Sequence, residues 1–238
     1  LHNYRDVFSE DGRPGCTNLA EHRIDLVPGA RPRKDRFRPL NPILQEDFRR
    51  QLQKWLALNL VQRSQSPWAS SLVPVRKKSG AIRWCCDFRF LNSVTVRDAV
   101  PIGSVDDNLA KLAGSKIFSV VDAASAFFNV PIRPGDRHKT AFASPFGLFE
   151  WTRLPFGLTN APATYSRLMS EIISSLQNPA RFLQYLDDIV VHSATLEEHL
   201  ADLGMLLEAH RRANIRLEKT KCQIARSSVS YLGNTVSA

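Results

Sequence analysis

The feature that most constrains this chain is the acidic doublet Asp187-Asp188, which stands between two β-rich apolar runs at residues 181–184 and 189–191. Successive side chains of a strand point to opposite faces, so two adjacent carboxylates share one space only if the chain turns there. We therefore expect a hairpin with the doublet at its tip. Burial of two like charges is costly unless a cation compensates them. The doublet favours a divalent metal site, although an isolated Asp-Asp is more often a solvated turn.

The basic charge of the chain is concentrated in one region. The net charge is +9, from 32 Lys/Arg against 23 Asp/Glu. Residues 31–78 contain 12 Lys/Arg and 3 Asp/Glu, so this region alone carries the whole excess. Its basic residues are interleaved with Phe37, Phe48, Trp55 and Trp68, a pattern that fits a polyphosphate backbone as partner. Charge alone also suits anionic membranes or RNA chaperoning, and nucleic acid is the favoured interpretation.

Several classes of protein are disfavoured by what the sequence lacks. Of the four cysteines, Cys85 and Cys86 are neighbours and no C-x-x-C is present, so we expect neither disulfides nor zinc, and a reducing compartment. There is no H-E-x-x-H motif and no Walker-type glycine loop. No apolar run is long enough to cross a bilayer, so no membrane partner is expected.

Two helices are predicted from caps and apolar periodicity. Asn41 and Pro42 begin a helix. Its expected buried face is Leu44, Phe48, Leu52, Trp55 and Leu56. Thr195 begins another helix in a capping box with Glu198. Its expected buried face is Leu196, Leu200, Leu203 and Leu207.

Strands alternate with helices without regular β-α-β spacing, which favours an α+β fold with a mainly antiparallel sheet. Further helices are expected around residues 105–112 and 161–176. The expected extended segments are residues 71–76, 81–88, 117–121, 142–152, 215–218 and 229–236.

A third carboxylate, Asp122, ends the apolar strand at residues 117–121 and stands 65 residues before Asp187. Neighbouring antiparallel strands would bring all three carboxylates together. Three carboxylates suit two Mg²⁺ ions, because hard cations prefer oxygen ligands and leave room for water and substrate phosphates. Two such ions stabilise both the attacking and the leaving oxygen of a phosphoryl transfer. Arg83 and the pair Lys77/Lys78 are candidates to hold a triphosphate.

The order and spacing of the motifs resemble those of the reverse transcriptases. The motifs are WASS at 68–71, VRKKSG at 75–80, DFRFLN at 87–92, FSVVD at 118–122, KTAF at 139–142, LPFGLTNAP at 154–162, YLDD at 185–188 and YLG at 231–233. The arm, with HRIDL at 22–26 and PGA at 28–30, resembles specifically the polymerases of gypsy-type (metavirus-like) LTR retrotransposons. The resemblance covers nearly the whole chain.

This resemblance implies a right-hand polymerase fold made of fingers and palm, with an antiparallel palm sheet packed on helices and the thumb absent. The implied boundaries are an N-terminal arm at 1–40, fingers at 41–96 and 130–160, and palm at 97–129 and 161–238. Thumb, RNase H and integrase regions would belong to a parent polyprotein. The oligomeric state is left open. The expected location is intracellular, in the cytoplasm, in virus-like particles or in the nucleus.

The resemblance also implies roles for individual residues. Asp122 and Asp187 would be the main metal ligands and Asp188 a weaker third, for two Mg²⁺ ions that Mn²⁺ could replace. Phe127 falls where the family places the steric gate that excludes a ribose 2′-hydroxyl. The implied nucleotide-binding residues are Lys77, Lys78, Arg83, Phe127, Phe156 and Gly157. The implied template and primer contacts are Arg89, Asn92, Pro162, Leu232 and Gly233. Lys219 or Lys221 would be the proton donor to pyrophosphate.

One stretch departs from the family pattern. After Asp122 the chain has Ala126 where Gly is common and Asn129 where Gln is common. The aromatic gate is kept, so the departure bears on sugar discrimination and not on the metal site.

The predicted function is therefore RNA-directed DNA synthesis, with an RNA template, a DNA primer or RNA–DNA hybrid, and deoxynucleotides as partners. The alternatives are a catalytically idle polymerase fold that serves as a nucleic-acid-binding scaffold, and a metal-dependent nuclease. The scaffold would not need all three carboxylates, and the nuclease has no use for a gate at Phe127.

Overall fold

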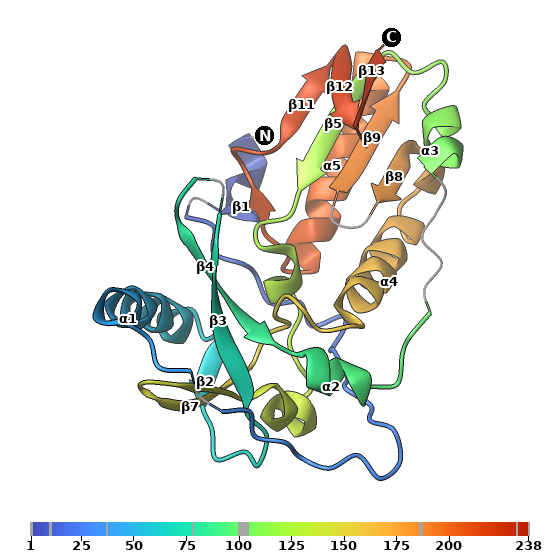
Figure 1. Ribbon diagram of the computed structural model, residues 1–238. Coiled ribbons are helices and arrows are strands. Elements are labelled where there is room, and N and C mark those ends of the chain that lie inside the picture. Colours follow the sequence, from blue (N-terminus) through green and yellow to red (C-terminus); the bar gives the residue numbers. More distant parts are fainter. Residues whose placement is uncertain are drawn as a thin grey trace. The chain divides into compact units, whose positions relative to one another are not determined.

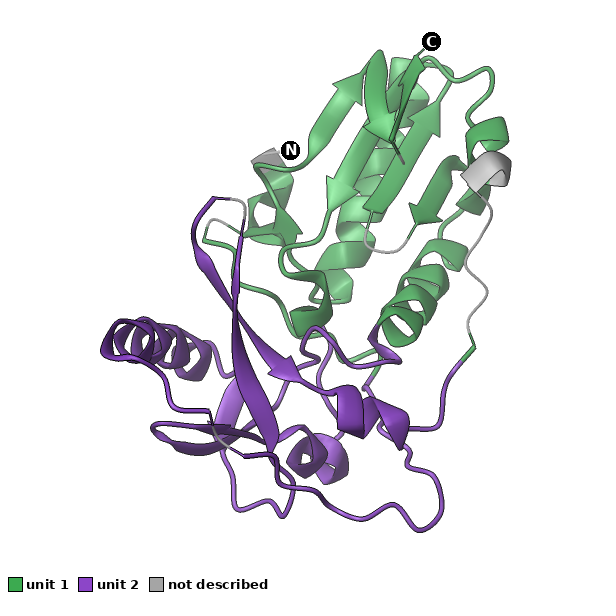
Figure 2. Ribbon diagram, viewed as in Figure 1, with its two compact units in different colours: residues 1–20, 99–129, 162–238 green, residues 21–98, 130–161 purple. Residues whose placement is uncertain are grey.

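The computed structural model describes residues 2–9, 11–36, 38–77, 79–99, 105–185, 188–231 and 233–237. The chain forms two compact units, coloured separately in Figure 2. Unit 1 comprises residues 1–20, 99–129 and 162–238, and unit 2 comprises residues 21–98 and 130–161. The predicted arm is therefore divided, because residues 1–20 belong to unit 1 and the rest of the arm to unit 2.

Unit 1 is built on a four-stranded antiparallel sheet with the order β11-β5-β9-β8 (Figure 1). Its strands are β5 (Ile117–Asp122), β8 (Phe182–Tyr185), β9 (Asp188–Ser193) and β11 (Gln223–Arg226). β8 and β9 are adjacent in sequence and paired, as expected for the strands on either side of the acidic doublet. β5 lies between β9 and β11 in the order of the sheet.

The two faces of this sheet have different neighbours. On the first, which we call the hairpin face, Phe118, Val120 and Val190 pack with Val229 and Tyr231 of the hairpin β12 (Ser228–Tyr231) and β13 (Asn234–Ser237). The second, which we call the helix face, packs against α4 (Ala161–Ser174) and α5 (Leu196–Arg212). Strand alternation assigns each residue to one face.

The remaining elements of unit 1 surround this sheet. The N-terminal strand β1 pairs in parallel with β10. Their bounds, with those of the short helices, are η1 (His2–Val7), β1 (Phe8–Ser9), α3 (Val105–Lys111), η2 (Ala126–Asn129), η4 (Pro179–Arg181) and β10 (Leu217–Glu218). The predicted cap of α5 is confirmed, since the Thr195 side chain accepts a hydrogen bond from the Glu198 backbone N–H.

The predicted buried face of α5 is partly wrong. Leu203 and Leu207 are buried, but Leu196 and Leu200 are 53% and 56% exposed. The face that meets the sheet is completed instead by polar residues, including His199 and Asp202. Apolar periodicity misses such a face, because hydrogen bonds and not apolar area compensate its burial.

The predicted C-terminal strands also need correction. The segment predicted as one strand at 229–236 is the hairpin β12–β13, and Gly233, with φ of +80°, lies in its turn. β11 was not predicted at all, since its residues are mostly exposed and offer no apolar alternation. The expected strand at 215–218 is limited to β10.

Unit 2 contains a five-stranded sheet with the order β2-β7-β6-β3-β4, in which only the pair β3–β6 is parallel. Its elements are α1 (Pro42–Ala57), β2 (Val61–Arg63), β3 (Ser70–Arg76), β4 (Ile82–Asp87), α2 (Arg89–Ser93), η3 (Pro134–Thr140), β6 (Phe142–Ser144) and β7 (Gly147–Trp151). Both sheets together confirm the predicted α+β fold with antiparallel strands packed on helices.

Helix α1 packs on the unit 2 sheet through aromatic rings. The Asn41 side chain caps the helix by accepting from the Leu44 N–H at 2.8 Å. Trp55 lies 4.7 Å from Trp151, measured between ring centroids. Of the predicted apolar face, Leu56 is the error, since it is 38% exposed.

No helix among the residues that the structure describes is long and apolar enough to cross a membrane.

Candidate active site

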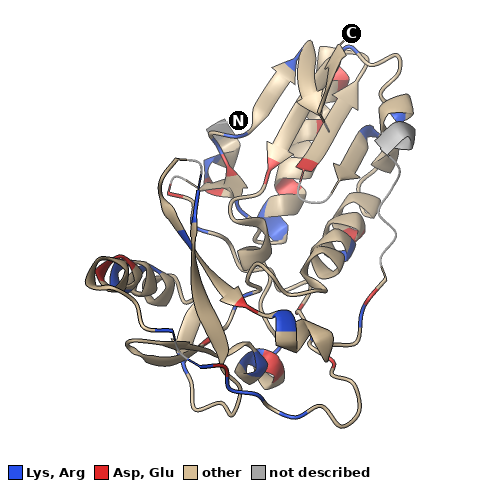
Figure 3. Cartoon of the chain, in the orientation of Figure 1, with Lys and Arg blue, Asp and Glu red and all other residues tan. Residues whose placement is uncertain are grey.

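The first candidate site residues to come together are Asp122 and Asp188. Asp122 ends β5 and Asp188 begins β9, and the register of this antiparallel pair sets them directly opposite each other. Directly opposite residues project from the same face, so both carboxylates lie on the hairpin face. Figure 3 shows the acidic ends of the two strands beside each other. Asp122 and Asp188 therefore lie on neighbouring antiparallel strands, as they must if they are to bind the same metal ions. Asp187 lies outside the described residues.

Lys221 provides a cationic partner for Asp122. Its ammonium Nζ lies 3.0 Å from Oδ1 and 3.3 Å from Oδ2 of the carboxylate. The backbone builds this contact: β10 is joined to the end of β5 by a bridge between Ala123 and Leu217, and β11 pairs along β5. The short turn between β10 and β11 therefore has to pass beside Asp122. Lys219, in the same turn, makes no ion pair with any residue that the structure describes.

These groups fit a divalent cation. Paired carboxylate oxygens are the ligands that Mg²⁺ prefers, and the Lys221 ammonium already occupies one position where positive charge is stabilised. Within the described ranges, which leave out Asp187, no group of three or more His, Cys, Asp or Glu residues is arranged to hold a metal. The third ligand that the sequence predicts, Asp187, lies outside the described residues.

The hairpin β12–β13, which packs on the hairpin face, contains the predicted primer contact Gly233. Tyr231 is 2% exposed and belongs to the apolar cluster with Phe118 and Val120, and Tyr185 packs against that cluster. Burial raises the pKa of Tyr231 to about 12. Gly233 lies in the turn at a positive φ that favours glycine. Leu232 lies outside the described residues.

The predicted gate residue Phe127 lies in η2, just after β5. Its ring is half-buried and meets the ring of Tyr165 edge-on, with 5.8 Å between centroids. Tyr165 comes from α4, in whose first turn the predicted template residue Pro162 is exposed. Asn129, at the end of the same short helix, is fully buried. The sequence marked Asn129 only as a departure from the family, although a polar side chain beside Phe128 and Val130 is a signal of a buried hydrogen-bonding residue.

In unit 2, the predicted phosphate-binding residues lie on the β3–β4 hairpin. Arg83 is exposed on β4, opposite Val75. Lys77 is exposed at the turn, where its backbone N–H donates to the Ala81 carbonyl at 2.8 Å. Gly80 takes a positive φ of +82°, which the tight turn requires. Lys78 lies outside the described residues.

The other predicted residues of unit 2 form a second group. Arg89 pairs with Asp87 through two hydrogen bonds of 2.8 and 2.6 Å. Asn92 holds the loop after β7 in place: its amide donates to the Gly157 carbonyl at 2.8 Å and accepts from the Thr159 N–H at 2.9 Å. Phe156, before Gly157, is 51% exposed. The structure therefore gives Asn92 a structural task in addition to its predicted template contact.

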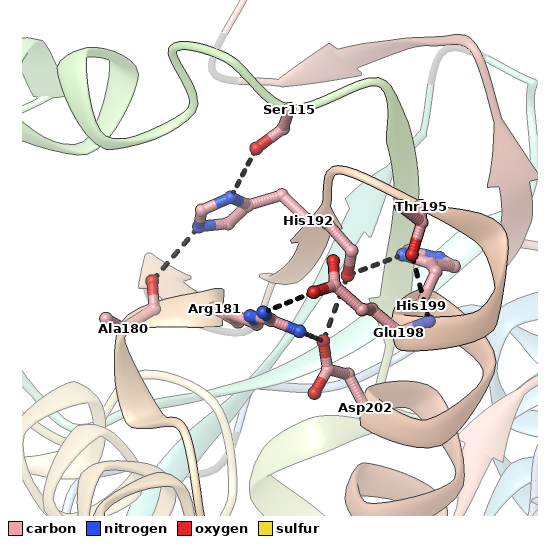
Figure 4. A network of polar contacts seen from close by, with 9 residues as sticks. Ser115, Ala180, Arg181, His192, Thr195, Glu198, His199 and Asp202 are labelled. Carbon is pink, nitrogen blue, oxygen red and sulfur yellow. Dashed lines mark hydrogen bonds and ion pairs between the residues drawn. The ribbon is translucent and has the colours of Figure 1, made fainter.

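A buried polar network around His199 and Asp202, on the helix face, was not predicted (Figure 4, which also shows His192 on the other face). The ring of His199 lies between two hydroxyls, with Nε2 2.7 Å from Ser119 Oγ and Nδ1 3.2 Å from Ser193 Oγ. Ser193 donates to Asp202 at 3.0 Å, and Arg181 donates to the same carboxylate at 2.9 Å. Ser119 lies on β5 and Ser193 on β9, so α5 is bonded to both strands that carry the candidate carboxylates.

The direction of these bonds fixes the tautomer of His199. Ser119 Oγ accepts from the Ala225 N–H at 2.9 Å and is free to donate its proton to His199 Nε2. The other nitrogen, Nδ1, then carries the proton and donates to Ser193. Burial lowers the pKa of His199, so the ring is neutral in this network.

A groove of about 810 Å³ lies elsewhere, on the helices of unit 1. Residues from α4 and α5 line it, including Ile172, Leu200 and Met205, together with Tyr4 from the N-terminal segment. None of the candidate carboxylates that the structure describes lines this groove. It is separate from the candidate site, whose described carboxylates are placed by the β5–β9 register.

The similarity of this chain to known proteins agrees with this geometry. The family described as "Reverse transcriptase (RNA-dependent DNA polymerase)" matches residues 75–236. The chain is 33% identical, over 99% of its length, to the "Retrovirus-related Pol polyprotein from transposon 297" of Drosophila melanogaster, and 30% identical, over 84% of its length, to the "Transposon Tf2-3 polyprotein" of Schizosaccharomyces pombe. The chain belongs to the reverse transcriptase family, and its retrotransposon relatives confirm the predicted kinship with gypsy-type elements.

Solved structures support the fold. The foamy viral protease-reverse transcriptase in complex with RNA/DNA hybrid matches the whole chain with a TM-score of 0.89 at 22% identity, and its dRH form in complex with double-stranded DNA gives 0.89 at 23%. The fold is that of polymerase fingers and palm, as predicted. The chain covers 32% of the first of these structures, and it spans 23% and 15% of the two polyproteins.

Proposed function

We propose that this chain catalyses RNA-directed DNA synthesis, adding deoxynucleotides to the 3′ end of a primer. The observation that carries the proposal is the opposition of Asp122 and Asp188 across β5 and β9, in a chain of the reverse transcriptase family. The in-line transfer of a phosphoryl group needs little covalent help from protein and depends on positioning and charge neutralisation.

Asp122, Asp187 and Asp188 are proposed to hold two Mg²⁺ ions, for which Mn²⁺ can substitute. When bound, the ions stabilise the attacking 3′-oxygen and the leaving pyrophosphate oxygen. The contact between Lys221 and Asp122 supports the fit, because it marks a position where the carboxylate accepts a cation. The same contact favours Lys221 over Lys219 as the proton donor to pyrophosphate.

Phe127 is proposed to exclude the 2′-hydroxyl of ribonucleotides. Arg83 with Lys77 or Lys78 would bind the triphosphate, and Phe156 with Gly157 would line the pocket. Arg89, Asn92 and Pro162 would meet the template, and Leu232 with Gly233 the primer. An RNA template and an RNA–DNA hybrid are the proposed partners, in line with the hybrid-bound foamy viral enzyme. The polyprotein relatives support a longer parent protein. We place it in the cytoplasm, in virus-like particles or in the nucleus, and we propose that it carries the thumb, RNase H and integrase regions.

The test is primer extension on an RNA template with and without Mg²⁺. Asp122→Asn should lower the extension rate at least about 100-fold, because it removes charge stabilisation at the reacting phosphate. Asp187→Asn should do the same. Glu197→Gln, on the exposed side of α5, is the control and should extend like the wild type.

Binding of a labelled RNA–DNA hybrid, measured by fluorescence anisotropy, separates catalysis from affinity. Asp122→Asn should retain binding. Binding without any magnesium-dependent extension by the wild type would leave the scaffold as the function. Cleavage of the hybrid without extension would favour the nuclease.

A further inference from the structure

The loop after β5 is held together by one side chain. Asn129 is 0% exposed, and its amide uses all of its hydrogen-bonding capacity. Nδ2 donates to the carbonyls of Ala124 at 2.9 Å and Ala126 at 3.0 Å. Oδ1 accepts from the backbone N–H of Gly15 at 2.7 Å and of Arg216 at 3.1 Å. Three segments distant in sequence therefore meet at a single amide.

The partners of Asn129 have little room to move. A Cβ added to Gly15 would lie 1.9 Å from the Asn214 carbonyl oxygen, so only glycine brings the N-terminal segment this close. The Thr17 N–H donates to the Asn129 carbonyl at 2.8 Å, and the Asn214 side chain donates to the Cys16 carbonyl at 2.9 Å. Residues 15–17 are thus fixed against the loop from both sides.

The loop itself cannot maintain its own shape. η2 is a 3₁₀ turn of four residues, and a helix so short is not stable alone. Ser125, just before η2, has a φ of +50°, a conformation unfavourable for a residue with a Cβ. The amide of Asn129 bonds to the carbonyls on either side of Ser125, so it compensates this strained conformation.

Phe127 lies within this loop, and its ring is packed edge-on against Tyr165. The Phe127 ring is therefore held on one side by Tyr165 of α4. The backbone of Phe127 is held by the hydrogen bond of Asn129 to the neighbouring Ala126 carbonyl. A gate discriminates by sterics alone, so a displacement of a fraction of an ångström changes what fits beside it.

We propose that Asn129 is a positioning residue for sugar selection, which locks the loop carrying Phe127 to residues 15–17 and to Arg216. Through it, the N-terminal segment takes part in discrimination between deoxyribonucleotides and ribonucleotides. This inference rests on the proposed function of Phe127 as the gate.

The experiment measures the ratio of kcat/KM for a deoxynucleotide to that for the matching ribonucleotide, in primer extension. Asn129→Ser shortens the side chain so that its four bonds are lost, and the ratio should fall about tenfold or more. Asn108→Ser makes the same substitution at another buried asparagine of unit 1, on α3, and should leave the ratio unchanged. A general loss of folded protein lowers both kcat/KM values and leaves their ratio constant.

A double-mutant cycle shows whether Asn129 acts through the ring. Phe127→Ala alone should lower the ratio further than Asn129→Ser, and the double variant should match Phe127→Ala. Additive effects would mean that Asn129 influences sugar selection by another route, which would overturn the proposal. If Phe127→Ala keeps the ratio of the wild type, the assignment of Phe127 as the steric gate is wrong. If only Asn129→Ser keeps that ratio, the inference alone fails.

A milder variant covers the case in which Asn129→Ser does not fold. Asn214→Gly removes the hydrogen bond to Cys16, and glycine suits the φ of +49° at that position. The ratio should fall by less than tenfold, since one hydrogen bond at the far side of residues 15–17 is lost. An unchanged ratio in this folded variant contradicts a role for the N-terminal segment.

Discussion

Unit 2 packs α1 against its sheet through aromatic rings, whereas unit 1 packs α5 against its sheet partly through hydrogen bonds. In unit 2, Phe48 lies 4.8 Å from Trp84 and Trp55 lies 4.7 Å from Trp151, between centroids. In unit 1, the corresponding layer contains His199 and Asp202. The aromatic layer is compact and uncharged, and the polar layer contains groups that titrate. The two units should therefore respond differently to truncation and to pH.

The largest effect is expected from truncation in the aromatic layer. Trp55→Ala should lower the free energy of unfolding by about 3–5 kcal/mol, because a large buried ring is lost and a cavity remains. Urea unfolding followed by far-UV circular dichroism measures it, and the loss should be equal at pH 7.5 and pH 5.5. Ile43→Ala, in the same helix but 80% exposed, is the control, with a change within about 0.5 kcal/mol. A similar loss in both variants would contradict the aromatic layer as the basis of unit 2.

In the polar layer, removal of one charge should be nearly as costly. Arg181→Met leaves Asp202, 2% exposed, without its cation. The free energy of unfolding should fall by about 2–3 kcal/mol, less than for a fully buried pair because Arg181 is 32% exposed. Arg212→Met, whose partner Glu208 lies at the surface, should cost less than about 1 kcal/mol.

A compensating substitution sharpens this second prediction. In the variant with both Arg181→Met and Asp202→Leu the buried unpaired charge of Asp202 is removed, and only Glu198, whose side chain is 41% exposed, is left without its cation. Most of the lost stability should therefore return. If the double variant is as unstable as Arg181→Met alone, the cost lies in packing and not in the unpaired charge.

The pH dependence of stability should come from the histidines of unit 1. Burial lowers the pKa of His192, His199 and His210 in the folded state. In the unfolded chain they titrate near 6.5, so below that pH the unfolded state binds protons that the folded state does not. Their stabilising contribution is complete above about pH 6.5 and is lost as the pH falls towards the folded pKa values. The loss is at most about 1.4 kcal/mol per pH unit for each histidine.

The measurement is the urea midpoint between pH 7.5 and pH 5.5. His192→Gln should reduce the slope of stability against pH by up to one proton. The ring of His192 bonds to Ser115 and to the Ala180 carbonyl. The lowered pKa of Asp136 in unit 2 does not interfere, because it affects stability only below about pH 4. Burial alone would raise the pKa of Asp136, but hydrogen bonds from Lys139 and Arg133 outweigh it. A pH-independent midpoint would show that the buried histidines of unit 1 are not the groups that titrate.

The smallest effect concerns charge, which also differs between the units. Within the basic region of unit 2, Arg33 is already engaged with Asp35 at 2.9 Å and with the ring of Phe90. Arg31 and Arg36 are exposed and better placed to meet a phosphate backbone. Replacement of both by Ser should lower the slope of log affinity against log salt by up to about 1.8. Fluorescence anisotropy with an RNA–DNA hybrid measures it. The control Lys116→Ser, in unit 1, should leave this slope unchanged. If the control lowers the slope as much as the double variant does, the basic region of unit 2 is not the preferred contact of the phosphate backbone.

The sequence predicts best what rests on local apolar patterns. Phe48, Leu52 and Trp55 were assigned to the core of α1 correctly, because their spacing matches one helix face. Leu196 and Leu200 were assigned wrongly, since α5 buries His199 and Asp202 in their place. A hydrogen-bonded face leaves no trace in a pattern of apolar residues.

For the candidate site, the sequence identified which strand ends carry carboxylates but not which strands pair. The pairing of Asp122 with Asp188 follows from contacts between segments 66 residues apart in the chain, and no local rule encodes them. The resemblance implied that Asp122 and Asp188 hold the same metal ions, but it assigned no strand pairing. It did not reveal Asn129 as the centre of a hydrogen-bonded loop, because that role depends on Gly15 and Arg216, which lie in distant segments.

The alternation of side chains along β5 and β9 has a consequence for how this chain can change. Asp122 and Asp188 share their face with Val120 and Val190, while Ser119 and Val191 face the helices. One residue inserted into β9 would exchange the faces of the β9 side chains on one side of the insertion, while most backbone pairing stayed possible. An insertion after Asp188 would turn an acid towards α5 or an apolar side chain out of the hairpin face. Along these two strands, a change of length should therefore be tolerated far less than a change of residue, and relatives should differ in amino-acid type but seldom in spacing.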